Sequence, residues 1–278
     1  RAHLKILKVL NNNAVVFKEG GVEKIAMGPG IAFQKGKNDL INAAKVEKVF
    51  VMKEEQEKFQ ELLKNLPEEH IQVAEEIISY AEQQLSATLS HHVHIALSDH
   101  LSFAVERIAR GISIQNKLLN EIKSLYQPEY AIGVWALQHI KKRLDITMPI
   151  DEAGYIALHI HTAKLNSPGM QQLMMNTTII NEMVTIIKKE LNMEIDENSM
   201  SYQRLLTHLR FALNRLAQNE PFHEMDEEML DVLKVKYKKS YQCAETIKQF
   251  VKEEYDINFP EAELGYITLH ICRIEQRI

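Results

Sequence analysis

The feature that most limits how this chain can fold is an internal duplication. Residues 97–108 (LSDHLSFAVERI) match residues 205–216 (LLTHLRFALNRL), and residues 152–160 (EAGYIALHI) match residues 263–271 (ELGYITLHI). The offsets, 108 and 111 residues, far exceed the roughly 20 to 50 residues of a solenoid repeat. Apolar residues recur at helical spacing in this part of the chain. We therefore predict two copies of one all-α module of about 105–110 residues.

The residues ahead of the duplication have the pattern of a small β domain. Alternating apolar runs occupy residues 4–10, 14–17, 22–27 and 46–51. Asn11–Asn13 and Gly20–Gly21 separate the first three runs and favour turns. The pattern predicts a four-stranded antiparallel sheet. Because a sheet of this size buries too little surface to be stable alone, we expect a second copy of the chain to cover it in a symmetric dimer.

Charge also separates this β segment from the rest of the chain. Residues 1–52 carry nine Lys and Arg against four Asp and Glu, and they hold five of the ten glycines. The remaining residues carry 24 basic against 34 acidic side chains. A basic, glycine-rich segment on an acidic body is typical of an anion-binding module joined to one with another task. Chance clustering is the alternative.

These patterns predict a multidomain fold. A small antiparallel four-stranded β domain, which we call the head, is expected at 1–56, and two duplicated all-α helical bundles follow it. We call the bundles the first module (57–168) and the second module (169–278). The two cysteines cannot form a disulfide framework and fit a reducing cytosol. No apolar run approaches the roughly 20 residues that a membrane-spanning helix needs.

Two pairs of histidines recur at equivalent places in the modules. They are His100 and His159 in the first module, and His208 and His270 in the second. A single histidine on an apolar helix is usually a packed or surface residue. Retention of the same pair in both copies argues for a function, because the surrounding residues have diverged far more. Imidazole can act as a metal ligand, as a general acid or base, or as a nucleophile that accepts a phosphoryl group.

Phosphoryl acceptance fits the duplicated histidines best. A phosphoryl group would add a charge of roughly −1.5 to −2, which is enough to make or break a helical interface. Arg107 and Arg215 lie seven residues after His100 and His208, on nearly the same helix face. They are candidate partners for the added charge. Ordinary surface ion pairs are the alternative reading of both arginines.

A metal site and a catalytic site have weaker support. Further potential metal ligands in the first module are His91, His92, His94, Asp99 and His161. The second module has Thr207 where the first has Asp99, and Cys272 where the first has His161. No phosphate-cradling Gly-Lys-Ser/Thr loop or nucleophile-elbow motif is present. We predict no catalytic residue, no metal and no cofactor, so the chain is not expected to be an enzyme.

The motifs resemble those of a known regulatory family. Residues 8–13 (KVLNNN), 27–35 (MGPGIAFQK) and 45–50 (KVEKVF) resemble the RNA-binding co-antiterminator domain of the BglG/SacY family. The two modules resemble that family's phosphotransferase regulation domains. The resemblance covers essentially the whole chain. Within the family, residues 97–108 and 152–165 look closest to sucrose-operon antiterminators, followed by β-glucoside antiterminators.

The resemblance implies a transcriptional antiterminator that acts as a homodimer. The head would bind a hairpin in nascent RNA and prevent the overlapping terminator stem from forming. Carried over residue by residue, the RNA contacts fall on Lys8, Asn11, Asn13, Gly28, Pro29, Gly30 and Phe33. These side chains suit the task, because Asn reads base edges, Gly allows close approach, Phe stacks and Lys meets phosphate. Some members have arginine where this chain has Pro29, so a contact would be missing here.

The resemblance also implies control by phosphorylation. A sugar permease (enzyme II) would phosphorylate His100 and His159 and switch the protein off. The phosphocarrier protein HPr would phosphorylate His208 and His270 and favour the active dimer. The alternative function is a DNA-binding activator built on the same regulatory modules. It would need a helix-turn-helix, and residues 1–56 show no such pattern, so we expect no DNA binding.

Overall fold

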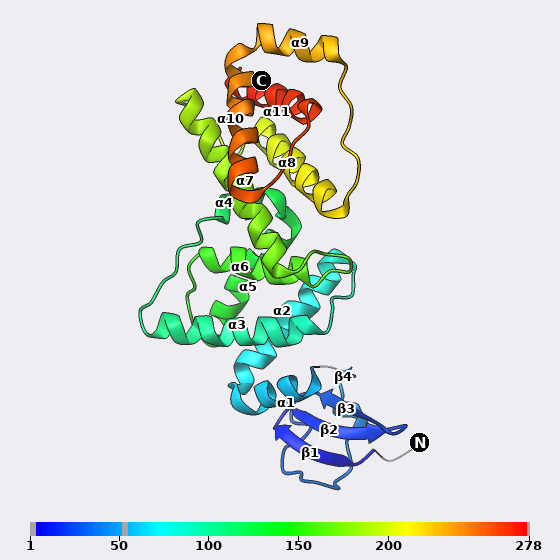
Figure 1. Ribbon diagram of the computed structural model, residues 1–278. Helices are drawn as coiled ribbons and strands as arrows, with labels where there is room; N and C mark the ends of the chain where they lie inside the picture. The colour runs from blue at the N-terminus through cyan, green and yellow to red at the C-terminus, as the bar shows by residue number, and fades with distance from the viewer. Residues whose placement is uncertain (1–3, 52–54, 277–278) are drawn as a thin grey trace. The chain divides into compact units, whose positions relative to one another are not determined.

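The computed structural model describes residues 4–51 and 55–276. They fold into two compact units, the first made of residues 4–51, 55–115 and 128–167 and the second of 116–127 and 168–276 (Figure 1). The strands are β1 (Ile6–Asn11), β2 (Ala14–Glu19), β3 (Val22–Met27) and β4 (Lys48–Phe50). The first unit also holds α1 (Gln56–Asn65), α2 (Glu68–Leu85), α3 (His92–Ala109), α5 (Gln127–Leu144) and α6 (Asp151–Thr162). The second unit holds α4 (Leu119–Leu125), α7 (Met170–Leu191), α8 (Met200–Gln218), α9 (Glu227–Lys236), α10 (Lys238–Tyr255) and α11 (Glu261–Glu275).

The head is the antiparallel sheet that the alternating runs predict. Its strands pair in the order β1-β2-β3-β4, so each strand lies beside its neighbour in sequence. Gly20 and Gly21, between β2 and β3, have φ of 60° and 84°. A two-residue hairpin turn with both central residues at positive φ matches the twist of the flanking strands. The prediction of a four-stranded sheet followed by helical modules is confirmed.

Both faces of the sheet are covered within the chain. On one face, Val16, Ile25 and Phe50 pack against Phe59 and Leu63 of α1, among other residues. On the other face, the loop between β3 and β4 supplies apolar side chains from residues 31–46. Helices of the first module therefore occupy the place we expected a second copy to fill. The dimer itself stays a prediction.

In the first module, α2, α3, α5 and α6 enclose one apolar core. Helices α5 and α6 approach closely at Gly133, where an added Cβ would lie 2.2 Å from the carbonyl oxygen of Ala153. Helix α6 also carries His159, so this contact helps to place a candidate site residue. No helix among the described residues has the length and apolarity that crossing a membrane requires.

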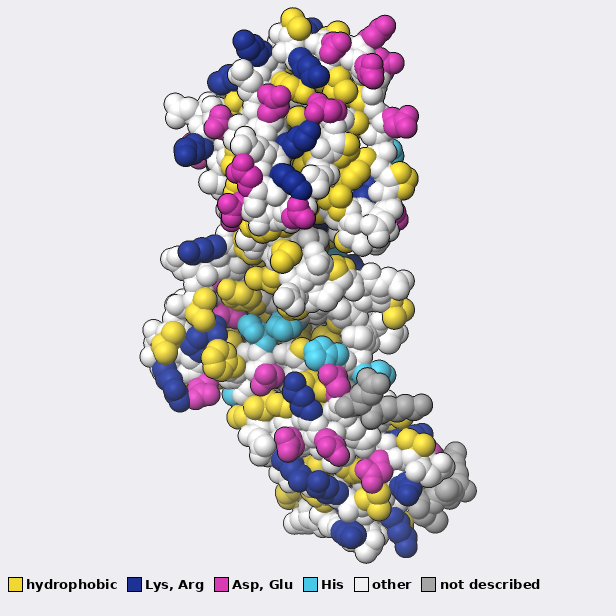
Figure 2. All heavy atoms as spheres, viewed as in Figure 1, with side chains coloured by type: hydrophobic (Ala, Val, Ile, Leu, Met, Phe, Trp, Pro, Cys, Tyr) yellow, Lys and Arg dark blue, Asp and Glu magenta, His cyan; other side chains and the backbone are white. Residues whose placement is uncertain are grey.

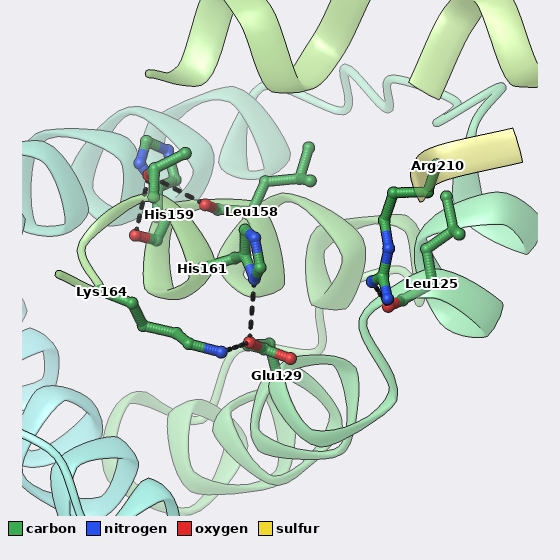
Figure 3. A network of polar contacts seen from close by, with 8 residues as sticks. Leu125, Glu129, Leu158, His159, His161, Lys164 and Arg210 are labelled. Carbon is green, nitrogen blue, oxygen red and sulfur yellow. Dashed lines mark hydrogen bonds and ion pairs between the residues drawn. The ribbon is translucent and has the colours of Figure 1, made fainter. Parts of the chain in front are cut away.

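Helix α4 precedes the junction expected near residue 168, yet it packs in the second unit. It contacts α7 and α8. Asn181 of α7 donates a hydrogen bond to Glu121 at 2.9 Å. Arg210 of α8 donates one to the carbonyl oxygen of Leu125 at 2.7 Å, as Figure 3 shows. These bonds explain why residues 116–127 group with the second unit. The boundaries at 56 and 168 stay predictions.

We expect Gly133→Ala to destabilise the first module by about 1–3 kcal/mol, because the added methyl group would push α5 and α6 apart. Urea unfolding measures the change. Gly169→Ala is the matched control, since an added Cβ at Gly169 meets nothing within 4 Å. Equal stability of the two variants would contradict the close approach at Gly133.

Candidate functional site

The first module brings His100 and His159 together beside a buried carboxylate. His100 lies on α3 and His159 on α6, and their ring centroids are 4.9 Å apart. Nε2 of His100 donates a hydrogen bond to Glu152 at 3.0 Å. Glu152 lies seven residues before His159, on the same face of α6. It is only 1% exposed. Tyr155 adds an aromatic ring 5.8 Å from that of His100.

The second module repeats this arrangement. His208 on α8 and His270 on α11 have ring centroids 4.9 Å apart. Nε2 of His208 is hydrogen-bonded to Glu263, which is buried. The ring of Tyr266 lies 5.9 Å from that of His208. The duplicated motifs therefore build two matching clusters of two imidazoles, one carboxylate and one phenol.

One imidazole of each pair is kept neutral. Burial, with a further contribution from the charge of His100, lowers the pKa of His159 to about 3. Burial lowers the pKa of His270 to about 4, and neighbouring positive charges add to the effect. Nδ1 of His270 is buried and has no hydrogen-bond partner among the residues that the structure describes. A neutral imidazole has a free nitrogen lone pair, which nucleophilic attack requires.

The two modules surround their histidine pairs with different cations. Arg107, as its spacing from the histidine suggested, reaches the same cluster, where it is buried and paired with Glu152. Its counterpart Arg215 instead donates to Nε2 of the exposed His223 at 2.7 Å. Arg204 and Arg273 are the permanent cations whose charge reaches His270.

A surface cavity opens over the histidine pair of the first module. Its volume is about 380 Å³, and both histidines line it together with Lys58, His92 and Asp99. Phe103 also lines it and is 60% exposed. Histidine side chains are visible on the surface of this module in Figure 2. A reacting group on another protein could therefore approach His100 from solvent.

The other histidines considered as metal ligands have separate partners. His161 bonds Glu129 at 3.0 Å, and Lys164 bonds the same carboxylate at 2.5 Å (Figure 3). Although burial opposes it, these bonds lower the pKa of Glu129 to about 2. His159 and His161 lie on different faces of α6, as residues two apart in a helix must.

The residues near the start of α3 are likewise separated. His92 pairs with Glu55 at 2.9 Å on the surface, while His94 is buried and bonds Glu75 at 2.6 Å. His91 lies beside His94, with ring centroids 6.3 Å apart. His92 and His94 thus pair with different carboxylates, Glu55 and Glu75, and do not share one site.

Most of the expected RNA contacts form one edge of the head. The Asn11–Asn13 turn is joined to the loop after β3, because Asn13 accepts a hydrogen bond from the Gly30 amide at 2.7 Å. Gly28 donates its amide to the carbonyl oxygen of Asn13 at 3.0 Å. Phe33 lies in the same loop and is 59% exposed, so its ring is accessible for stacking.

The fold itself requires glycine at two of these positions, Gly28 and Gly30. A Cβ on Gly28 would lie 1.7 Å from the carbonyl oxygen of Lys45, and Gly30 has φ of 61°. Both positions therefore require glycine whether or not RNA is bound. Lys8 is exposed and close to Lys64 of α1, and the pKa of Lys64 is lowered by this neighbour. Lys64 extends the basic surface and was missed by the sequence interpretation.

The histidine partners were also missed. Glu152 and Glu263 lie in the duplicated motifs, seven residues before His159 and His270. That spacing places carboxylate and imidazole on one helix face, so the signal was available. Arg204 and Arg273 have no counterpart in a repeated motif. Arg273 lies three residues after His270 on α11, so helical spacing alone brings it near. Arg204 comes from α8, and only the tertiary packing places it near His270.

Comparison with known protein families accounts for most of the chain. The CAT RNA binding domain family matches residues 4–59, and the PRD domain family matches residues 75–163 and 181–274. A crystal structure of GlcT CAT-PRDI aligns with a TM-score of 0.55 and 32% identity, covering 59% of this chain and all of that one.

Similar full-length proteins are named as regulators of transcription. The transcription antiterminator LicT of Bacillus subtilis is 41% identical over 98% of this chain and 99% of its own length. The beta-glucoside operon antiterminator of Dickeya chrysanthemi is 39% identical over 99% of this chain and 98% of its own length. The expected closeness to sucrose-operon antiterminators stays a prediction.

We expect stability to decrease below pH 6.5, in part because of His159. The unfolded chain binds a proton on this imidazole near pH 6.5, whereas the folded chain does so only near pH 3. The stabilising contribution is therefore complete above pH 6.5 and loses about 2 kcal/mol by pH 5. Urea unfolding at pH 7.5 and pH 5 measures it. In His159→Gln the decrease should be smaller by that amount, and an unchanged decrease would contradict the assignment.

Proposed function

Because this chain belongs to the BglG/SacY family of transcription antiterminators, we propose that it binds a nascent-RNA hairpin as a homodimer and prevents a terminator from forming. Proteins of this family join a CAT RNA-binding domain to PRD domains. Phosphorylation of His100, His159, His208 and His270 controls this activity. The observation that supports the control most directly is the repeated geometry, with ring centroids 4.9 Å apart in both modules.

The histidine clusters suit phosphoryl transfer. A neutral imidazole nitrogen attacks phosphorus, a P–N bond forms, and the bond from phosphorus to the donor protein breaks, with the electron pair leaving on the donor. In the first module the product places roughly two negative charges near buried Glu152. Repulsion between the two anions would weaken the hydrogen bond from His100, and Arg107 would be drawn from the carboxylate to the phosphoryl group. The α3–α6 interface would therefore rearrange.

A phosphoryl group should stabilise the second module, whereas it should disrupt the first. Arg204 and Arg273 contribute permanent positive charge near His270, and Arg215 is not committed to Glu263 but to His223. A phosphoryl group here meets more available cations than in the first module. We propose that HPr phosphorylates the second module and stabilises the active form, whereas the sugar permease phosphorylates the first module and disrupts it.

The head is the RNA-binding part of this proposal. Its exposed Phe33 can stack on an unpaired base, and the Asn11–Asn13 turn lies against the Gly28–Gly30 loop where backbone can approach RNA closely. The alternative, a DNA-binding activator, would place a helix in the major groove. Residues 4–51 form a sheet with one short 3-10 helix, Ala43–Lys45, which does not favour that mode.

The sugar is proposed from the names of the relatives. One of them is named for a β-glucoside operon, and its similarity extends through both modules. We therefore propose that this chain controls genes for β-glucoside use, with sucrose as the competing possibility. Readthrough measured with each sugar in turn distinguishes the two.

We expect Phe33→Ala to weaken binding to the antiterminator hairpin about tenfold, because a stacked base is worth roughly 1–3 kcal/mol. A gel shift with hairpin RNA measures this, and duplex DNA of the same sequence should not shift. Val22→Ala is the control, since Val22 is also exposed but lies at the opposite hairpin turn. Equal affinity of the two variants, or preference for the DNA, would count against the proposal.

We expect His208→Ala combined with His270→Ala to lower readthrough in cells while leaving the head able to bind the hairpin, because only the activating phosphorylation is lost. Mass spectrometry after incubation with phosphorylated HPr should show loss of the label from this variant. Gln218→Ala, at an exposed residue of the same module, should keep both the label and the readthrough. Label that persists on the double variant would refute the assignment.

A further inference from the structure

A cavity of about 400 Å³ separates the head from α2 and α5. Four of the proposed RNA contacts line one wall, namely Asn11, Asn13, Gly28 and Pro29. The facing wall includes Glu68, Glu75 and Glu76 of α2. This volume corresponds to a small-molecule site, so an RNA stem cannot enter while α2 stays in place. The wall that faces the RNA-binding edge is also acidic, and carboxylates repel phosphates.

Hydrogen bonds hold the same edge against the first module. Asn11 donates its side-chain amide to the carbonyl oxygen of Leu63 at 3.0 Å, and the backbone amide of Asn12 donates to Glu68 at 3.0 Å. The Asn11 side-chain oxygen accepts the amide of Asn13 at 2.8 Å. The groups that would read base edges are therefore already bonded within the chain.

A buried ion cluster fastens β4 to the first module. Lys48 donates to Glu75 at 2.8 Å, and His94 bonds the other oxygen of this carboxylate at 2.6 Å. Glu75 is 6% exposed. Burial alone would raise the pKa of Glu75, but its partners outweigh burial and hold that pKa below its usual value. Breaking such a cluster leaves an unpaired buried charge, which is costly.

We infer that the acidic face of α2 competes with RNA for the Asn11–Gly28 edge of the head, so that this structure is a closed form. The inference rests on the proposed RNA contacts. The competitor is a segment of this chain, which carries carboxylates where the RNA would carry phosphates. The RNA-binding form requires that the head leaves α2, and the apparent affinity is reduced by the fraction of closed molecules.

The chain contains its own reporter of this opening. Trp135 is the only tryptophan, it lines the cavity, and it stacks on Tyr80 with ring centroids 3.7 Å apart. When the head leaves, water reaches the cavity wall and the Trp135 emission moves to longer wavelength. This signal does not depend on RNA.

The test uses the full chain with Glu68→Gln and Glu75→Gln combined. We expect the affinity for hairpin RNA to rise about tenfold, because charged hydrogen bonds that hold the closed form are weakened, and the Trp135 emission to shift to longer wavelength. Glu57→Gln with Glu69→Gln is the matched control. It removes the same charge from α1 and α2, at exposed residues that do not line the cavity. Glu68→Gln alone, which leaves the buried cluster intact, should give a smaller change in the same direction.

Hairpin RNA added to the wild-type chain should shift the Trp135 emission as the double substitution does. If the wild-type chain binds hairpin RNA and the double variant matches the Glu57/Glu69 control in affinity and emission, the competition is refuted while the proposed function stands. If the emission shifts but no variant binds the hairpin, the proposed function fails and the inference fails with it. A thermal unfolding curve for each variant confirms that the comparison is between folded chains.

Discussion

The regulatory part of this molecule depends on one buried carboxylate in each module. Glu152 and Glu263 are 1% and 2% exposed, and a buried carboxylate is tolerated only when it is paired. Each one pairs with a histidine from a neighbouring helix, which fixes α3 on α6 and α8 on α11. The same pairing sets the two imidazoles side by side. On the proposed function, a phosphoryl group added to a histidine of either cluster would change the ion pairing that holds the helices, and the cluster would act as a switch.

Helix α1 connects the first of these clusters to the head. Lys58 lines the cavity above His100 and His159, while Phe59 and Leu63 pack against the sheet. Lys58 and Phe59 are neighbours in sequence. A displacement of α1 caused by charge at the histidines would therefore also move the side chain that packs on the sheet. The contact of α1 with the sheet thus suits the proposed role of the first module as the off switch.

On the proposed function, two surfaces of the head would meet different partners. The sheet face that packs on Phe59 and Leu63 is apolar, and the Asn11–Gly28 edge is polar and hydrogen-bonded to the first module. Dimerisation through the first surface and RNA binding through the second would each need the head to leave α1 and α2. Both events therefore favour the same open form, and each would make the other easier.

The alternation of apolar residues and the internal duplication were sufficient to predict much of the secondary structure and domain order of this protein. The period of two in residues 4–27 predicted β1, β2 and β3, and the duplication predicted both modules and singled out the four histidines among twelve. Periodicity says which face of an element is buried, but it does not say which element covers that face. The pairing of Glu75 with Lys48, the placement of α4 with α7 and α8, and the placement of α2 beside the Asn11–Gly28 edge join residues far apart in the chain. Such contacts follow from how complete elements pack and from where buried charges find partners, and only the tertiary structure decided them.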